Sequence, residues 1–144
     1  MWSQSLDNML DDALAELHGT PHADDDVVHD RLGRSIMDSH AIRLLGYRQL
    51  AKQQRGLVPS EQSILKLMGS EAQQDLAALM LETLGAAALD QTVDSTLRFP
   101  YETDRGAESW SDQYLRTFAG TISGGTSEIQ RNIVAERVLD LPRG

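Results

Sequence analysis

Apolar residues recur at helical spacing along most of the chain. In the first segment they return every three or four residues, which places them on one stripe of a helix. That stripe consists of Trp2, Leu6, Met9, Leu10, Ala13, Leu14 and Leu17. Gly19 and Pro21 then interrupt the pattern. The acidic Asp24, Asp25 and Asp26 follow, and they supply an N-cap and favourable charge for the start of the next helix.

Two long helices are predicted next. The first covers about residues 27–54 and ends before Gly56 and Pro59. Ser60 suits the N-cap of the second, which extends to about Leu84. The apolar positions of the two helices are Val28, Leu32, Ile36, Leu44, Leu45 and Leu50, and then Ile64, Leu65, Met68, Ala72, Leu76, Leu79 and Met80.

The stretch from Gly85 to Trp110 has no clear period and is predicted to be irregular. Connections of this length are uncommon inside compact domains and are often functional. A fourth helix is predicted to begin near Ser109 or Ser111 and to reach about Thr117. A terminal helix follows the glycine pair, with an apolar face made of Ile129, Ile133, Val134 and Val138.

No segment shows a strand pattern, a repeat or low complexity. The predicted fold is therefore all-α, an up-and-down helical bundle in which residues 1–144 form a single domain. The chain has 144 residues, of which 40% are hydrophobic and 24% charged, as in ordinary soluble globular proteins.

The formal net charge of −9 argues against nucleic acid and anionic membrane surfaces as partners. Cysteine is absent, which excludes disulfides and thiolate-bound metals. The first residues lack the basic region of a signal peptide, and no apolar run approaches the ~18 residues of a membrane helix. We expect a cytoplasmic protein without membrane insertion.

The four histidines offer a weak metal signal. His18 and His22 are four residues apart, but Pro21 lies between them and prevents a shared helical turn. His29 and His40 add no ligand spacing, so solvated surface is the favoured interpretation. HExxH, Walker A and GxGxxG patterns are absent, and the serine, histidine and aspartate residues form no local catalytic signature.

The most specific local feature is the start of the terminal helix. Ser127 and Gln130 have the spacing of a capping box, and Thr126 is an alternative cap one position earlier. Gly124 and Gly125 leave the preceding backbone amides open to close approach. Such a helix start suits a phosphate, ribose or carbonyl oxygen. The alternative is an ordinary glycine turn before a helix.

The segment "GGTSEIQRNIVAERVLDLP" closely resembles the C-terminal signature of acyl-CoA dehydrogenases, the flavin enzymes that form an α,β-double bond in acyl-CoA thioesters. Residues 63–89 look like the long helix of that family, and residues 24–54 resemble the preceding helix of actinobacterial-type members. The resemblance implies the C-terminal helical domain alone. The N-terminal helical domain and the middle β-domain would belong to a longer flavoprotein, of which this chain is an engineered, processed or natural fragment.

The resemblance assigns roles to the tail. It implies that Thr126, Ser127 and Glu128 contact FAD and that Gly125 lies near the thioester. Gly124 occupies the position of the family's frequent catalytic glutamate, and a glycine cannot accept the α-proton. The resemblance therefore implies no catalytic residue in this chain. The base would lie on a helix upstream of Met1, or the protein would be a non-catalytic partner.

A second flavin contact is altered. In the family, a Gln-x-x-Gly-Gly turn reaches the FAD of a neighbouring subunit, and the matching positions here are Glu82, Gly85 and Ala86. A carboxylate near a pyrophosphate is unfavourable unless it is paired or protonated. The family's Arg-x-Gln-Phe-Gly stretch is replaced by "ELHGTPHADDD".

Two functions follow from the resemblance. The chain is expected to contribute to the FAD and acyl-CoA site, and to the oligomer core, of an acyl-CoA dehydrogenase. The alternative is a non-catalytic module that supports a catalytic partner. The implied partners are an acyl-CoA thioester and like subunits in a homo- or hetero-oligomer. The fragment alone is expected to be inactive and to retain no FAD.

Overall fold

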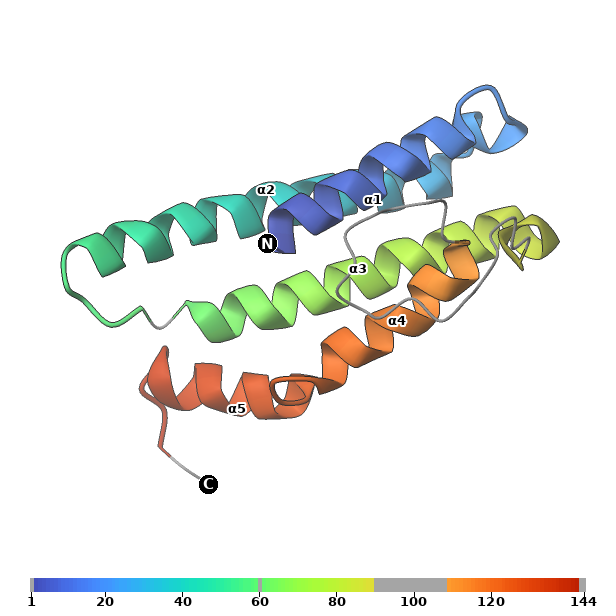
Figure 1. Cartoon of the computed structure of the whole chain (residues 1–144). Helices are drawn as coiled ribbons and strands as arrows, with labels where there is room; N and C mark the ends of the chain where they lie inside the picture. The colour runs from blue at the N-terminus through green and yellow to red at the C-terminus, as the bar shows by residue number, and fades with distance from the viewer. Residues whose placement is uncertain (1, 60, 90–108, 143–144) are drawn as a thin grey trace, which may run out of the picture.

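The computed structural model describes residues 2–59, 61–89 and 109–142 (Figure 1). These residues form five α-helices and two 3₁₀ segments, and the described ranges contain no strand. The α-helices are α1 (Trp2–Leu17), α2 (Asp26–Gln54), α3 (Gln62–Leu84), α4 (Trp110–Ile122) and α5 (Ser127–Arg137). The 3₁₀ segments are η1 (Pro21–Asp24) and η2 (Gly85–Leu89). The prediction of an all-α fold is confirmed.

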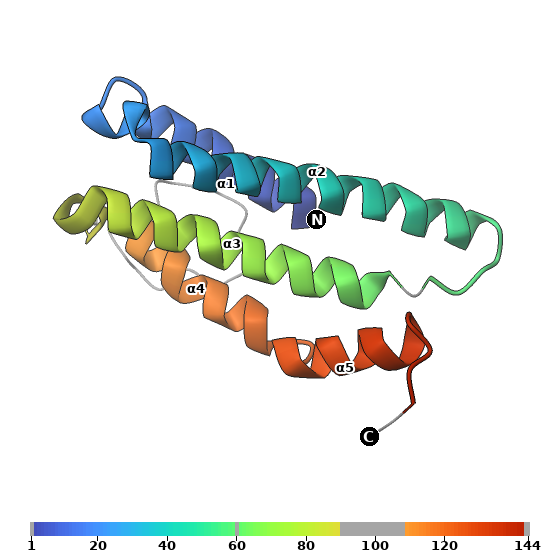
Figure 2. The ribbon, with the colours of Figure 1, turned by 180° about the vertical axis from the view of Figure 1, so that it is seen from behind.

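Helix α3 lies at the centre of the bundle. Helices α1 and α2 pack on one side of it, while α4 and α5 follow its other side (Figures 1 and 2). All four of these helices contact α3 directly. Since α1, α2 and α3 alternate in direction, the first half of the chain has the expected up-and-down arrangement (Figure 1).

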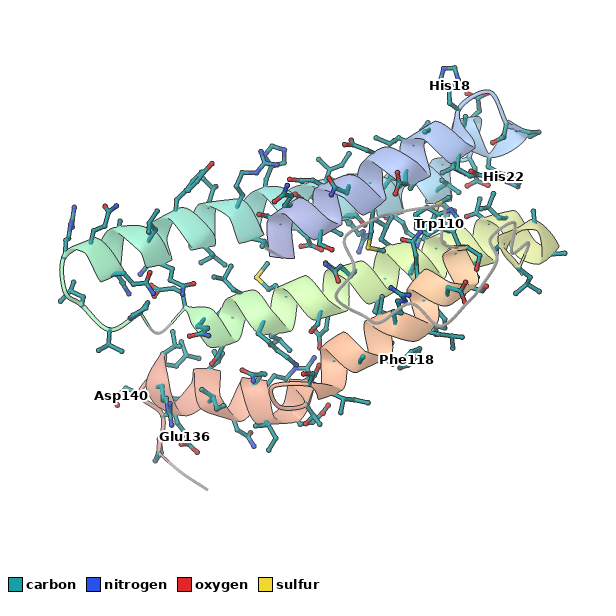
Figure 3. All side chains as sticks on the ribbon, viewed as in Figure 1. His18, His22, Trp110, Phe118, Glu136 and Asp140 are labelled. Carbon is teal, nitrogen blue, oxygen red and sulfur yellow. The ribbon has the colours of Figure 1, made fainter. Side chains whose placement is uncertain are left out.

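The core is built mainly from the predicted apolar faces of α1, α2 and α3, whereas the predicted apolar face of α5 adds no residue to it, and Ile129 is 50% exposed. On α1, Leu6, Leu10, Ala13 and Leu17 are buried, whereas Leu14 is 46% exposed at the edge of the stripe. The four buried side chains of α1 pack with residues of α3 and of the first half of α2 in one cluster, which also includes Trp110 of α4 (Figure 3). The other buried members of that cluster are Val28, Leu32, Ile42, Ala72, Leu76, Leu79, Met80 and Ala88.

The second half of α2 is less covered than its apolar pattern predicts. Leu44 is 67% exposed and Leu50 is 52% exposed, although Val28 and Leu32 near the start of the helix are buried. The reason is the difference in length, because α1 has 16 residues and α2 has 29. Helix α1 therefore runs beside only the first half of α2 (Figure 1).

The acidic helix start is confirmed at Asp25. Its carboxylate Oδ1 accepts the backbone N–H of Val27 at 2.8 Å and of Val28 at 3.2 Å. These bonds satisfy two of the amides that have no acceptor inside the first turn of a helix. The predicted cap at Ser60 lies outside the described residues, and Glu61, which occupies the N-cap position of α3, makes no side-chain cap bond.

Two predicted boundaries after α3 are wrong. The stretch that begins at Gly85 is not irregular at its start, because Gly85–Leu89 forms a 3₁₀ helix; the rest of it, residues 90–108, lies outside the described residues. Helix α4 is capped by Ser109 as expected but continues past Thr117 to Ile122. The backbone leaves the helical region at Ser123, the C-cap of α4, directly before the glycine pair. None of the described helices is long and apolar enough to cross a membrane.

Candidate functional site at the turn between α4 and α5

The turn between α4 and α5 needs glycine at two consecutive positions. Gly124 has φ of 70° and Gly125 has φ of 102°, in the left-handed region that side chains disfavour. A Cβ at Gly125 would also lie 3.0 Å from Nε2 of Gln130 and 3.3 Å from Cγ2 of Ile129. A Cβ at Gly124 would meet no atom within 4 Å. The backbone demands glycine at both positions, and close packing demands it only at Gly125.

Helix α5 is capped by Thr126. Its Oγ1 accepts the backbone N–H of Ile129 at 3.4 Å, and Ser127 is already the first helical residue. The predicted capping box between Ser127 and Gln130 is therefore wrong. Gln130 is 5% exposed, and its Nε2 donates to the carbonyl oxygen of Gly124 at 2.6 Å instead.

A lysine from the central helix holds the turn from the other side. Nζ of Lys66 donates to the carbonyl oxygen of Gly125 at 2.5 Å and to that of Thr121 at 3.4 Å. A cation close to the carbonyl end of α4 also interacts favourably with the dipole of that helix. Sequence analysis did not single out Lys66. The available signal was a lone lysine in the apolar run "SILKLM".

An ion-pair group ties α5 to α3 beside the turn. Nη2 of Arg131 lies 2.6 Å from Oε1 of Glu71, and Nη1 of Arg131 lies 3.3 Å from Oε1 of Glu128. The side chain of Glu128 is 78% exposed, so its pair contributes little to stability. Glu128 lies in the first turn of α5 with its side chain exposed to solvent.

The donor groups at the start of α5 suit an oxygen-rich ligand. The first four backbone N–H groups of a helix have no acceptor within it, and here the side chain of Thr126 reaches that of Ile129. The amides of Ser127 and Glu128 and the hydroxyl of Ser127 remain at the same helix end. Such a set, with the positive end of the helix dipole, binds phosphate, ribose or carbonyl oxygens.

The second group of predicted cofactor contacts lies at the end of α3. Oε2 of Glu82 is 2.5 Å from Nη1 of Arg31 on α2, so the carboxylate of Glu82 is paired with a cation. Gly85, with φ of 56°, ends the helix, and Ala86 follows in η2. The charge of Glu82 is thus balanced by Arg31 inside this chain.

One copy of the chain does not bring the two groups together. Lys66, which contacts Gly125, and Glu82 are sixteen residues apart on α3, which corresponds to about 24 Å along the helix axis. Helix α5 lies beside the first half of α3, and η2 lies at the opposite end (Figure 1). The site residues therefore form two separate places in this molecule.

The histidines take no part in the turn. His18 and His22 lie at the corner between α1 and η1, at the far end of the bundle from Asp140 (Figure 3). Within the described ranges no group of three or more histidine, aspartate or glutamate side chains could hold a metal ion.

A groove of about 360 Å³ lies between α1 and α2 and is lined by residues of both helices. In its wall, Ser39 donates to Oδ1 of Asp7, and Nη2 of Arg43 lies 2.7 Å from Oδ2 of the same carboxylate. The hydrogen bond from Ser39, together with that from Arg43 and its charge, lowers the pKa of Asp7. All donors of the network come from α2, so its evident role is to join α1 to α2.

Fold and turn define a class: an all-α domain in which a glycine turn and the N-terminus of the last helix pack against the central helix. Residues 3–139 match the family described as acyl-CoA dehydrogenase, C-terminal domain. The chain therefore belongs to the acyl-CoA dehydrogenase family, of which it represents the C-terminal domain. The predicted family is confirmed.

Mycobacterial relatives agree with this assignment. The acyl-CoA dehydrogenase IpdE1 of Mycobacterium tuberculosis is 31% identical over 145 aligned residues, which cover 99% of this chain and 33% of the relative. IpdE1 of Mycolicibacterium smegmatis is 33% identical over 124 residues, covering 86% of this chain and 28% of the relative. The chain thus spans about a third of the length of these relatives.

Solved structures share the fold. The ChsE4–ChsE5 complex from Mycobacterium tuberculosis contains a chain with a TM-score of 0.72 and 25% identity, covering 96% of this chain and 35% of that one. The Tcur3481–Tcur3483 steroid acyl-CoA dehydrogenase contains another, with a TM-score of 0.75 and 20% identity, covering 99% of this chain and 35% of that one.

Proposed function

We propose that this chain is the C-terminal domain of an FAD-dependent acyl-CoA dehydrogenase and that the α4–α5 turn faces the flavin and the thioester. The observation that carries the proposal is the turn itself, where two left-handed glycines precede the start of α5, and the first amides of a helix have no acceptor within it. The donor set fits a flavin, since hydroxyl and amide groups suit its polar oxygens and pyrophosphate. Bound FAD would supply the hydride acceptor for α,β-dehydrogenation.

The roles of the tail residues follow from this placement. Thr126, Ser127 and Glu128 would hold the flavin through hydroxyl and helix-start groups. Gly125 would let the thioester approach the backbone closely, because it has no side chain on the turn. Each of these roles is a binding or positioning role, and none moves a proton.

We infer that the base that removes the α-proton lies outside the α4–α5 turn of this chain. Gly124 has no side chain to accept the α-proton. Near the turn, the carboxylates of Glu71 and Glu128 are both paired with Arg131. We therefore assign the base to a carboxylate elsewhere in the longer polypeptide or in a second subunit.

The separation of the two cofactor groups favours an assembly. If Glu82, Gly85 and Ala86 also contact a flavin, the distance of about 24 Å along α3 places that contact far from the turn of the same copy. The contact would then be made across a subunit interface. The ChsE4–ChsE5 complex is a related two-protein assembly. The second candidate function is a non-catalytic subunit that supports a catalytic partner. Gly124 favours this candidate, because a glycine has no side chain that could accept the α-proton.

Expression of the complete polypeptide, alone and with a second subunit of the same family, tests both candidates. Flavin absorbance and dehydrogenation of straight-chain and steroid side-chain CoA thioesters would be measured. Bound flavin and turnover by the polypeptide alone identify the enzyme, and activity only with the second subunit identifies the supporting module. The proposal is rejected if both preparations lack flavin and activity. The isolated 144-residue chain is expected to purify without FAD.

Substitutions at the tail test the placement of the flavin. Ser127→Ala should reduce flavin retention in the assembled protein, because it removes a hydroxyl at the start of α5. Ser123→Ala is a matched control at the end of α4, where the residue caps that helix through its backbone N–H. Equal flavin content in the two variants would argue against a flavin at the start of α5.

A further inference from the structure

Two consecutive carbonyl groups of the turn are bonded from inside the bundle. Nε2 of Gln130 donates to the oxygen of Gly124 at 2.6 Å, and Nζ of Lys66 donates to the oxygen of Gly125 at 2.5 Å. The donors come from different helices, α5 and α3. Gln130 is buried and Lys66 is half-buried, so both bonds form in surroundings that water only partly reaches.

The direction of each carbonyl fixes the direction of the next N–H group. In a trans peptide the C=O and N–H bonds point in opposite directions, and the described part of the chain contains no cis peptide. Because Gln130 holds the oxygen of Gly124, the N–H of Gly125 points away from Gln130. Because Lys66 holds the oxygen of Gly125, the N–H of Thr126 points away from Lys66.

The outward N–H groups extend the donor set of the helix. Gly125 and Thr126 directly precede Ser127 and Glu128, whose amides have no acceptor within α5. Successive backbone N–H groups in a left-handed turn form a concave site for anionic oxygens. The left-handed φ angles of the two glycines allow this arrangement, but they do not by themselves determine the direction of the peptide planes.

We propose that Lys66 and Gln130 are positioning residues, each of which holds one carbonyl so that the following N–H faces the ligand of the turn. The ligand's identity, flavin or thioester oxygen, rests on the proposed function; the orientation of the N–H groups does not. Each residue is expected to affect a different peptide group, because Lys66 bonds the carbonyl between Gly125 and Thr126, whereas Gln130 bonds the carbonyl between Gly124 and Gly125.

Backbone ¹⁵N relaxation of the 144-residue chain tests this selectivity. In the wild type, the amides of Gly125 and Thr126 should have order parameters near the ~0.85 of rigid backbone. Lys66→Met should lower the value for Thr126 toward or below ~0.6, and Gln130→Met should do the same for Gly125. Lys66→Arg, which keeps a cationic N–H donor, should restore Thr126. Arg34→Met removes one positive charge from an exposed pair on α2 and serves as the control.

Unchanged order parameters at both amides in the two methionine variants would overturn the proposal. An equal loss of order throughout α5 would also overturn it, because that result indicates general destabilisation. If Lys66→Met does not fold, Gln130→Met carries the test on the neighbouring peptide.

A second measurement separates this inference from the proposed function. In the assembled flavoprotein, Lys66→Met should weaken FAD binding by roughly tenfold to a hundredfold, the range expected for a hydrogen bond to a charged group. Lys66→Arg should recover most of that loss. A wild-type assembly without FAD would reject the proposed function, and the relaxation data would still decide the positioning roles. Wild-type FAD affinity in Lys66→Met would reject the role of Lys66 toward the flavin.

Discussion

The two glycines of the α4–α5 turn should respond differently to alanine. At Gly124 the cost is the left-handed backbone, about 1–2 kcal/mol, because a Cβ would meet no atom within 4 Å. At Gly125 the same cost applies, and the Cβ would also lie 3.0 Å from Nε2 of Gln130. Moving that amide breaks its bond to the oxygen of Gly124 and leaves a buried polar group unpaired, which costs about 1–3 kcal/mol. We expect Gly125→Ala to be more destabilising by that second amount.

Urea unfolding followed by far-UV circular dichroism measures this difference. Alanine also restricts the unfolded chain, which stabilises each variant by about 0.4–1 kcal/mol, but this term is common to both and cancels. In thermal unfolding, a domain of this size loses roughly 3–4 °C in Tm per kcal/mol. The Tm of Gly125→Ala should therefore be lower than that of Gly124→Ala by roughly 3 °C or more.

A double-mutant cycle identifies the source of the difference. In a Gln130→Ala background the amide is absent, so the excess cost of Gly125→Ala should fall by more than half. The remaining part reflects the contact of 3.3 Å with Cγ2 of Ile129. Equal costs for the two glycine variants in the wild-type background would refute the reasoning, as would an excess that Gln130→Ala leaves unchanged.

Three further predictions concern the scaffold. A hydrogen bond from Lys52 lowers the pKa of Glu61 from its usual 4.5, so the ionised carboxylate stabilises the fold above about pH 4.5. That stabilisation is lost as the pH falls through the lower pKa of the folded state. In urea unfolding, Glu61→Gln should therefore make the free energy of unfolding depend less on pH in this acid range. The same pH dependence in the variant and the wild type would contradict this prediction. Asp25→Ala should cost about 1 kcal/mol through the lost cap of α2, and Asp24→Ala, the control, should cost less. Leu76→Ala should cost about 2–5 kcal/mol, because that side chain is fully buried in the core; a value below 1 would contradict it.

The helices could be predicted because each depends on local residues. The apolar stripe of α1 identifies Leu6, Leu10 and Leu17 as core, and Asp25 caps α2 within the same few residues. The exposure of Leu44 could not be predicted in this way. It depends on how far α1 reaches along α2, which is a tertiary property that the pattern of α2 does not contain.

The location of the turn was predicted from the sequence, but the side-chain contacts that hold it were not. The glycine pair and the helix start at Thr126 are visible in the sequence. The spacing of Ser127 and Gln130 suggested a capping box, but the helix begins one residue earlier than that box requires, so the glutamine reaches back to Gly124. The contact of Lys66 joins segments about sixty residues apart, and sequence spacing carries no information about such a pair.

Gly124 and Glu82, the two positions predicted to differ from the family, have different physical consequences. Gly124 offers no side chain that could accept a proton, but the turn is held without one, because the carbonyl bonds from Lys66 and Gln130 need no side chain at that position. Glu82 adds a negative charge, but Arg31 offsets it within the same chain. Under the function proposed above, the backbone donors of the turn would bind the flavin, and a carboxylate elsewhere would remove the proton. That division of roles is the one a subunit needs when it completes a flavin site for a catalytic partner.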